Sequence, residues 1–594
     1  MLIWACFVLL SFNALAFNFF TAGPYIQADV FRHLEKIILP FLSGREGVSI
    51  LWSNHHPAPL LHLIQIVNLK FLGFRLDYDA YLGFFFQALT TFIILRSIIS
   101  TTTVENQNIS LLAALGAILV LAISLGFNSR LQYTFPLLTI YQHVYFFGIV
   151  VFITVDRCIQ EESKRRYLIV ALASLVFMFA NADYGTIFLA SITAINVLAY
   201  LFDRKTVYLR TTLVLASTWL AYHLFMLAIL PDTPSSPSSN SMGIVLALVG
   251  DPVGTFARFS VGLSSGLVDI VSLKATFPGA ASLLVFSSVV WTLFFVAIFI
   301  TYIRLQLFRV TLVPLALMLL AVVFSIPTMV FRFFLLDNDS WGLAAPRYVP
   351  TFKLAIIGML WALWLIIRKT VSTRGEPLGL PFKAIGVISI AAILYLQAVQ
   401  IHAGWEAAPR LSWTVQNNAL ALFIAGKTLE NDIELPRGII RFQKHYHPVL
   451  AYLEQNSLNV FSDKFPSSSL LDQHVESRRR FYASGGPSVI ARESGEFKDT
   501  QTDTGHVYAS WEMLQQSFVI NNKASKSLHI RVEIYSEFSD SLENLLVAEF
   551  EKKPARRIVL YKGKQNLFFD LDGGKRLSIK LPPKGKIEAV ELRM

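Results

Sequence analysis

Long apolar runs separated by short polar stretches fill the first 400 residues, whereas apolar and polar residues are more evenly mixed in the last third. A helix needs about 20 predominantly apolar residues to cross the roughly 30 Å hydrocarbon core of a bilayer. Eleven apolar runs of approximately this kind can be read, near 2–22, 78–98, 109–126, 137–155, 167–180, 184–202, 211–230, 280–303, 310–330, 350–367 and 381–400. The pattern predicts a mostly α-helical, polytopic membrane domain over residues 1–400.

The last third predicts two further regions, a helical linker over residues 401–505 and a small all-β, sandwich-like domain over residues 506–594. Residues 528–534 and 577–581 alternate apolar and polar side chains, which is typical of strands with one buried face. The sequence Asp572-Gly573-Gly574 lies just before the second of these strands, and we expect it to form a hairpin turn.

The distribution of charge supports this division and orients the chain. Hydrophobic residues make up 54% of the chain and charged residues 15%, against about 25% charge in soluble domains. Basic residues gather in four short clusters between apolar runs, at 157–166, 204–210, 304–309 and 368–374. Since cytoplasmic loops carry the excess of Lys and Arg, this side is expected to be cytoplasmic. The net charge of +11 then reflects topology, and nucleic-acid binding is not expected.

This topology places the N-terminus in the cytoplasm and everything after residue 401 outside it. Ala14-Leu15-Ala16 also fits a signal-peptide cleavage site, but no basic segment precedes it, and a retained first helix preserves the alternation. The three long loops, 23–77, 231–279 and 331–349, are then external, so chemistry or recognition is expected on the external face. Cys6 and Cys158 form no disulfide or metal-binding pattern.

The first external loop carries the main cluster of candidate catalytic residues. Asp29 stands beside Arg32 and His33, with Glu35 as a secondary acid. A carboxylate at a membrane boundary can serve as a general base, although a solvated loop acid is the simpler interpretation of Asp29 alone.

Later in the same loop, His55 and His56 precede Pro57 and an apolar segment that resembles a short interfacial helix. Adjacent histidines seldom bind one ion. Hydrogen bonding to a phosphate or sugar is therefore favoured; no metal site is assigned, and a divalent cation stays possible.

The order of these features resembles the N-terminal half of membrane glycosyltransferases of the GT-C type, which include the protein mannosyltransferases and the aminoarabinose transferase of lipid A. The resemblance rests on the acid after the first helix, on residues 56–61 (His-Pro-Ala-Pro-Leu-Leu), and on Ala345-Pro346-Arg347-Tyr348 before a late spanning run. It implies that Asp29 is the catalytic base or activates the acceptor. Arg347 and Tyr348, with Arg32, His33 and the histidine pair, would bind the donor phosphate.

Physical chemistry is compatible with that role for Arg347, because a guanidinium at the interface can hold a phosphate through two parallel hydrogen bonds. An Arg-Tyr pair can equally be an interfacial anchor. The chain departs from the family in having one acid rather than a pair at Asp29, and in lacking an acid before the fourth helix. Either Asp183 substitutes, or the activity differs or is lost.

The expected function is the transfer of a sugar from a polyprenyl-phosphate donor to a glycan or lipid acceptor, in a bacterial inner membrane. Such an enzyme would contribute to polysaccharides of the cell envelope. A transporter or flippase of lipid-linked saccharides and a protein similar to O-antigen polymerases remain the alternatives. A transporter predicts broken or polar helices and internal repeats.

Overall fold

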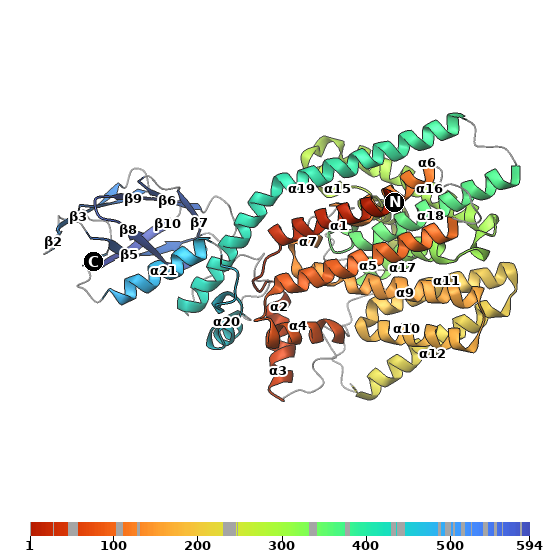
Figure 1. Cartoon of the computed structure of the whole chain (residues 1–594), viewed down its shortest axis with the longest axis horizontal. Coiled ribbons are helices and arrows are strands. Elements are labelled where there is room, and N and C mark those ends of the chain that lie inside the picture. Colours follow the sequence, from red (N-terminus) through yellow and green to blue (C-terminus); the bar gives the residue numbers. More distant parts are fainter. Residues whose placement is uncertain are drawn as a thin grey trace. The chain divides into compact units, whose positions relative to one another are not determined.

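The computed structural model describes the chain outside residues 1, 28, 45–57, 103–110, 128–130, 230–244, 246–247, 332–340, 375–379, 429–434, 436–445, 468, 485–488, 493–499, 503–504, 513–516, 524–525, 538–544, 552–554, 561, 583–584 and 594. The chain is mostly helical with a β region at its C-terminal end (Figure 1). It forms two compact units. The first contains residues 1–22, 44–64 and 79–409; the second contains residues 23–43, 65–78 and 410–594.

The first unit is a bundle of long apolar helices together with several short ones. They are α1 (Leu2–Thr21), α5 (Leu76–Thr102), α6 (Leu111–Leu125), α7 (Leu131–Thr134), α8 (Pro136–Ile140), α9 (Gln142–Gln160), α10 (Lys164–Ala180), α11 (Ala182–Asp203), α12 (Thr206–Ile229), α14 (Pro252–Ser265), α15 (Ile270–Thr276), α16 (Ala281–Arg304), α17 (Val313–Phe331), α18 (Val349–Arg374) and the first part of α19 (Leu380–Thr428). Short 3-10 turns lie at Pro278–Ala280, Leu307–Arg309 and Gly342–Ala344.

Within the described residues, nine helices are long and apolar enough to span a membrane, or ten if the bent pair α14–α15 is one span. The prediction of an integral membrane protein is confirmed in this coarse form, whereas the count of eleven is not reached. The two runs that fall short are 109–126, where α6 has 15 residues, and 167–180, where α10 has 17 and begins with Lys-Arg-Arg. The loop predicted at 231–279 also contains the two helices of the bent pair, which meet at 102°.

Helices α17 and α18 form the centre of this unit and pack directly against each other. Gly358 permits the close approach, because a Cβ there would lie 2.8 Å from the Pro314 carbonyl oxygen. Helix α18 is the most buried of the candidate spans, whereas only 6% of the residues in the most apolar window of α19 are buried. In a membrane protein such exposed apolar surface faces lipid.

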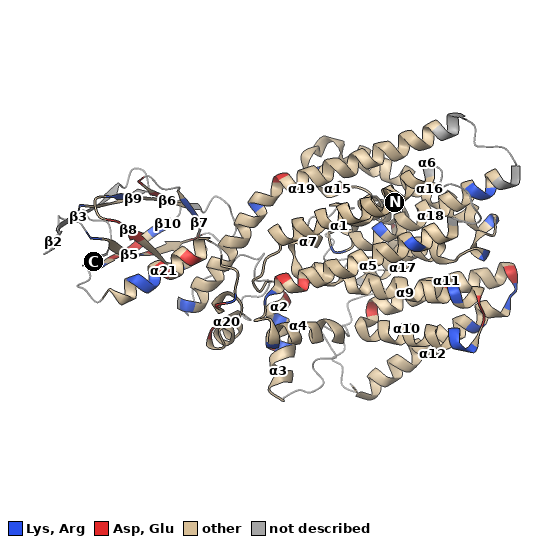
Figure 2. Ribbon diagram, in the orientation of Figure 1, with Lys and Arg blue, Asp and Glu red and all other residues tan. Residues whose placement is uncertain are grey.

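The predicted basic clusters come together at one end of the bundle (Figure 2). Arg210 forms an ion pair with Glu162 at 2.6 Å, and Arg309 forms one with Asp203 at 2.5 Å. The first pair joins the loop after α9 to the start of α12, and the second joins the end of α11 to the 3-10 turn after α16. The structure thus gathers these clusters on one face, and their assignment to the cytoplasm stays a prediction.

The second unit combines parts of the first loop with the C-terminal region. It contains α2 (Asp29–His33), a π-helical turn η1 (Leu34–Ile38), α3 (Leu39–Leu42), most of α4 (Pro59–Phe71), the end of α19, α20 (Tyr446–Gln455), the 3-10 turn η8 (Asn459–Phe461) and α21 (Ser469–Ala483). The helix predicted after Pro59 is therefore present as α4. Helix α19 runs without a break through residue 401, where the composition had suggested a boundary.

The β region has two antiparallel sheets, one of four strands in the order β1-β10-β5-β8 and one of six in the order β2-β3-β4-β9-β6-β7. The strands are β1 (Val489–Arg492), β2 (Thr500–Thr502), β3 (Gly505–Glu512), β4 (Ser517–Asn522), β5 (Leu528–Ser536), β6 (Leu545–Phe550), β7 (Arg556–Val559), β8 (Gly563–Leu571), β9 (Arg576–Lys580) and β10 (Gly585–Arg593). The first strands thus precede residue 506.

The alternation predicted for β5 is confirmed, because its side chains are alternately buried and half-buried along the whole strand. The hairpin predicted at Asp572-Gly573-Gly574 is wrong. A tight turn is present, with Gly574 at φ +72°, but it links β8 in one sheet to β9 in the other. The two strands do not pair, because β8 pairs with β5 and β9 pairs with β4 and β6.

Candidate functional site

Asp29 is the first residue of α2 and is half-buried, with Arg32 three residues later on the same side of the helix. The next turn, η1, is π-helical; such turns are rare and occur frequently at functional sites. His33 is buried, and its Nδ1 lies 3.3 Å from the Gln65 Oε1 on α4. This contact links α2 to α4. The structure therefore brings Asp29, Arg32, His33 and Glu35 onto one short helical segment.

This segment is held by a buried asparagine from the C-terminal region. The Asn459 side chain donates to the carbonyl oxygens of Pro24 at 3.1 Å and Phe74 at 2.5 Å, and it accepts a hydrogen bond from the Ile26 N–H at 3.1 Å. Its own N–H donates to the Gly73 carbonyl at 2.8 Å. Asn459 has φ +53°, a left-handed conformation that asparagine tolerates better than most residues. The start of α2 is thus fixed by contacts to a residue more than 400 positions away in sequence.

A second contact acts in the same region. Tyr25 is buried and accepts a hydrogen bond of 2.9 Å from the Asn418 Nδ2 of α19. Burial raises the pKa of Tyr25 to about 12, and the hydrogen bond from Asn418 opposes part of that increase. Tyr25 therefore stays a neutral hydrogen-bonding anchor at physiological pH, four residues before Asp29.

Arg347 and Tyr348 lie in the first unit, immediately before α18. The Arg347 guanidinium stands 4.9 Å from the centre of the Tyr348 ring, and Tyr348 itself is buried. The Nε of Arg347 is buried and has no hydrogen-bond acceptor among the described residues. A buried N–H of a charged group without an acceptor is costly, so this atom is suited to a ligand oxygen.

Asp183 lies at the same end of the first unit as Arg347. It is exposed, in the first turn of α11. The next residue, Tyr184, packs on Phe324, and Tyr348 packs on the same phenylalanine. Helix α11 then extends for 22 residues, about 33 Å, to Asp203 on the basic face. Arg347 and the basic clusters therefore occupy opposite ends of a bundle as thick as a bilayer.

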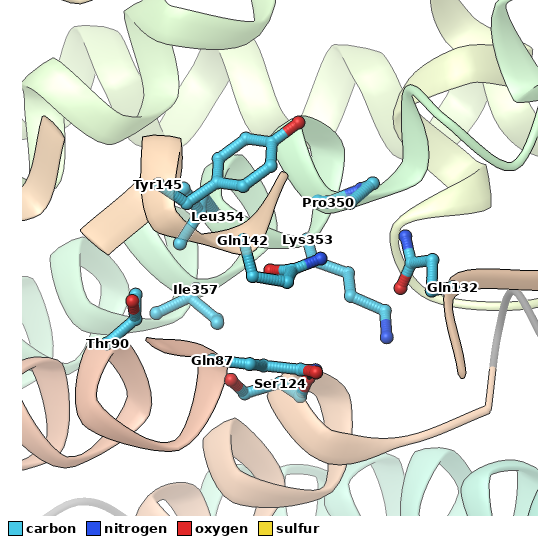
Figure 3. A pocket seen from close by; sticks show the side chains of 10 residues that line it. All are labelled: Gln87, Thr90, Ser124, Gln132, Gln142, Tyr145, Pro350, Lys353, Leu354 and Ile357. Atoms are coloured by element: carbon cyan, nitrogen blue, oxygen red, sulfur yellow. Dashed lines mark hydrogen bonds between the residues drawn. The ribbon is translucent and has the colours of Figure 1, made fainter. Parts of the chain in front are cut away.

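A small cavity lies inside the first unit beside α18 (Figure 3). It is lined by Gln87, Thr90, Ser124, Gln132, Gln142, Tyr145, Pro350, Lys353, Leu354 and Ile357. Its water-accessible space is about 20 Å³, which is enough for one water molecule. Lys353 was not among the predicted site residues, although a lysine four residues into a spanning run is itself a signal of function.

The predicted residues divide between the two units: Asp29, Arg32, His33 and Glu35 belong to the second, and Asp183, Arg347 and Tyr348 belong to the first. His55 and His56 lie outside the described residues. The described residues contain no group of three or more His, Cys, Asp or Glu side chains that could hold a metal ion. Comparison with protein families, characterised proteins and solved structures gives no match to this chain. The site must be interpreted from its own chemistry.

Proposed function

We propose that this chain is a membrane transferase that moves a sugar from a polyprenyl-phosphate carrier to a glycan or lipid hydroxyl on the external side of the membrane. The observation that carries the proposal is Arg347, a guanidinium at the start of a central membrane helix with a buried Nε and no described acceptor. Its position at the end opposite the basic face fits a lipid headgroup at the external boundary. A phosphate ester there would supply the missing acceptor and a counter-charge.

In this proposal the acceptor hydroxyl attacks the anomeric carbon of the donor sugar. The bond between that carbon and the phosphate oxygen breaks, and the configuration at the carbon inverts. Arg347 offsets the charge that remains on the lipid phosphate. The hydroxyl proton passes to a base, for which Asp29 is the candidate. The half-buried position of Asp29 at the start of α2, fixed through Asn459, supports its role as the base, because a general base must be held in place.

Binding of a polyprenyl phosphate tests the proposal directly. Arg347→Ala should weaken binding by about ten- to a hundredfold, the equivalent of one charge-assisted hydrogen bond. Arg347→Lys should be intermediate because the charge remains while the paired geometry is lost. Arg304→Ala is the matched control, since Arg304 is exposed on the basic face at the end of α16. Equal affinities of the wild type and all three variants would reduce Arg347 to an interfacial anchor.

A transporter of lipid-linked saccharides is the second candidate. Two observations favour it: the buried lysine Lys353 within α18, and the 102° bend between α14 and α15. Vesicles containing the purified chain separate the two functions. A transporter moves a labelled lipid-linked sugar across the bilayer without an acceptor, whereas a transferase releases the sugar only when a hydroxyl acceptor is present.

A further inference from the structure

Lys353 is a buried lysine in the most buried spanning helix. It is 4% exposed, and its ammonium nitrogen donates to the Gly126 carbonyl oxygen at 2.8 Å. That carbonyl follows the last residue of α6. The two preceding carbonyls, of Ser124 and Leu125, accept from the Gln87 amide and the Tyr133 hydroxyl. Three side chains from three other helices therefore satisfy the C-terminal end of α6.

This arrangement stabilises the ammonium only in part. The C-terminal end of a helix carries roughly half a negative charge, against the full positive charge of a lysine. Across the described part of the chain, no carboxylate forms an ion pair with Lys353. A buried charge usually has a partner, so part of the counter-charge is expected from a ligand.

Gln132 connects this lysine to the Arg347 segment. Its Nε2 donates to the Pro346 carbonyl oxygen at 3.3 Å, one residue before Arg347. Its Oε1 is buried without a described partner, and in Figure 3 it points toward the Lys353 ammonium. The cavity between them holds about one water molecule, so a phosphate cannot enter it as it stands. The flexible stem of Lys353 can, however, carry the ammonium toward the Arg347 boundary.

We propose that Lys353 and Arg347 both bind the anionic linkage of the carrier, so that the site prefers a diphosphate-linked lipid to a monophosphate-linked one. The inference rests on the proposed function and restricts the donor to lipids linked through a diphosphate. A sugar joined to a polyprenyl diphosphate carries one negative charge on each phosphate, and two cations match them. The monophosphate diester carries a single charge, which leaves one of the two cations without a partner. Without a ligand, Lys353 donates its hydrogen bond to the Gly126 carbonyl oxygen. When the ligand binds, the ammonium exchanges this hydrogen bond for one to the diphosphate.

The test measures binding of a polyprenyl-phosphate-linked sugar and of the corresponding polyprenyl-diphosphate-linked sugar to the full chain in lipid nanodiscs. The wild type should bind the diphosphate about ten- to a hundredfold more tightly, the effect of one additional charge-assisted contact. Lys353→Gln can still donate a hydrogen bond to Gly126 but lacks the charge, so it should lose this preference. Lys353→Arg keeps the charge and should retain most of it. Arg347→Ala should weaken binding of both lipids.

The outcomes distinguish the two proposals. A wild type that binds both lipids equally, through Arg347, refutes the role of Lys353 and leaves the proposed transferase intact. A preference that survives in Lys353→Gln also refutes it. A wild type that binds neither lipid overturns the proposed function and the inference with it. The wild-type preference needs no variant, so a poorly folded Lys353→Gln protein would not prevent a decision. Inorganic pyrophosphate serves as a third ligand, and equal competition by it at micromolar concentration would point to a soluble diphosphate instead of a lipid.

Discussion

Replacing Asn459 by alanine should loosen the start of the candidate catalytic segment although the residue touches no candidate catalytic group. The substitution removes the side-chain partner of the Ile26 N–H and of the Phe74 carbonyl; the Pro24 carbonyl keeps a second donor, the Leu76 N–H at 3.0 Å. Each buried group left without a partner costs about 1–3 kcal/mol. Alanine at φ +53° adds about 1–2 kcal/mol of backbone strain.

The sum, about 3–8 kcal/mol, is a large part of the 5–15 kcal/mol by which a typical domain is stable. Asn459→Gly separates the two contributions, because glycine loses the hydrogen bonds without the strain at positive φ. Asn456→Ala is the matched control, since Asn456 is exposed and its amide bonds only to the Tyr452 carbonyl one turn away.

Thermal unfolding and hydrogen–deuterium exchange of the full chain in detergent would measure the effect. Asn459→Ala should lower the unfolding midpoint and increase exchange in peptides that cover residues 23–43 and 65–78. Peptides from α17 and α18 should exchange as in the wild type. The reasoning fails if Asn459→Ala and Asn456→Ala give the same midpoint and the same exchange in the first-loop peptides.

Three further predictions concern mechanism, acid stability and topology. Asp29→Asn should reduce turnover by about 10²–10⁴-fold at normal protein yield, whereas Glu35→Gln should change it little; equal mild losses in both variants would exclude Asp29 as the base. His474 is buried between α19, α21 and β8, and burial, with Arg478 and Arg556 nearby, lowers its pKa to about 3. Below pH 6.5 the unfolded chain therefore binds a proton that the folded chain does not, so the second unit should lose about 2 kcal/mol between pH 6.5 and pH 5. Chemical denaturation should show a smaller loss over this interval in His474→Leu, and parallel curves for the two proteins would contradict the assignment. Finally, alkaline phosphatase fused after Met594 should be active and a cytoplasm-only fluorescent reporter dark, and the opposite pattern would reverse the topology.

Periodic features of the sequence were sufficient to predict much of the fold. The alternation in β5 and the long apolar runs follow from local pattern, because burial of one strand face or a whole helix imposes that pattern. The change of sheet after Asp572 could not be predicted, since a tight turn contains the same residues whether its strands pair or separate. The boundary predicted at residue 401 falls inside α19, which continues to Thr428. The composition changes there, but polar residues do not interrupt a helix, so the change in composition did not mark the end of this element.

The candidate site was predictable where a charged residue lies next to an apolar run, as with Asp29 and Arg347. Lys353 carries the same signal, a charged residue within an apolar run, but it lies inside a predicted span and not in one of the long loops. Asn459 gave no local signal at all. Its importance comes from three main-chain groups that lie far from it in the sequence, and only the folded chain brings them together.

The same asparagine also limits how early the second unit can fold during synthesis, because its partners in the first loop are made long before it. Asn459 follows Ile26 by 433 residues and Phe74 by 385. At about 5–20 residues per second, a ribosome needs roughly 20–90 s to make the chain between the first and the last of these residues. The early segments must wait for that interval, with their main-chain groups available to water, lipid headgroups or a chaperone. A chain released before residue 459 lacks the partner of these main-chain groups and cannot complete the unit. Its first loop would stay accessible to proteases at the membrane surface.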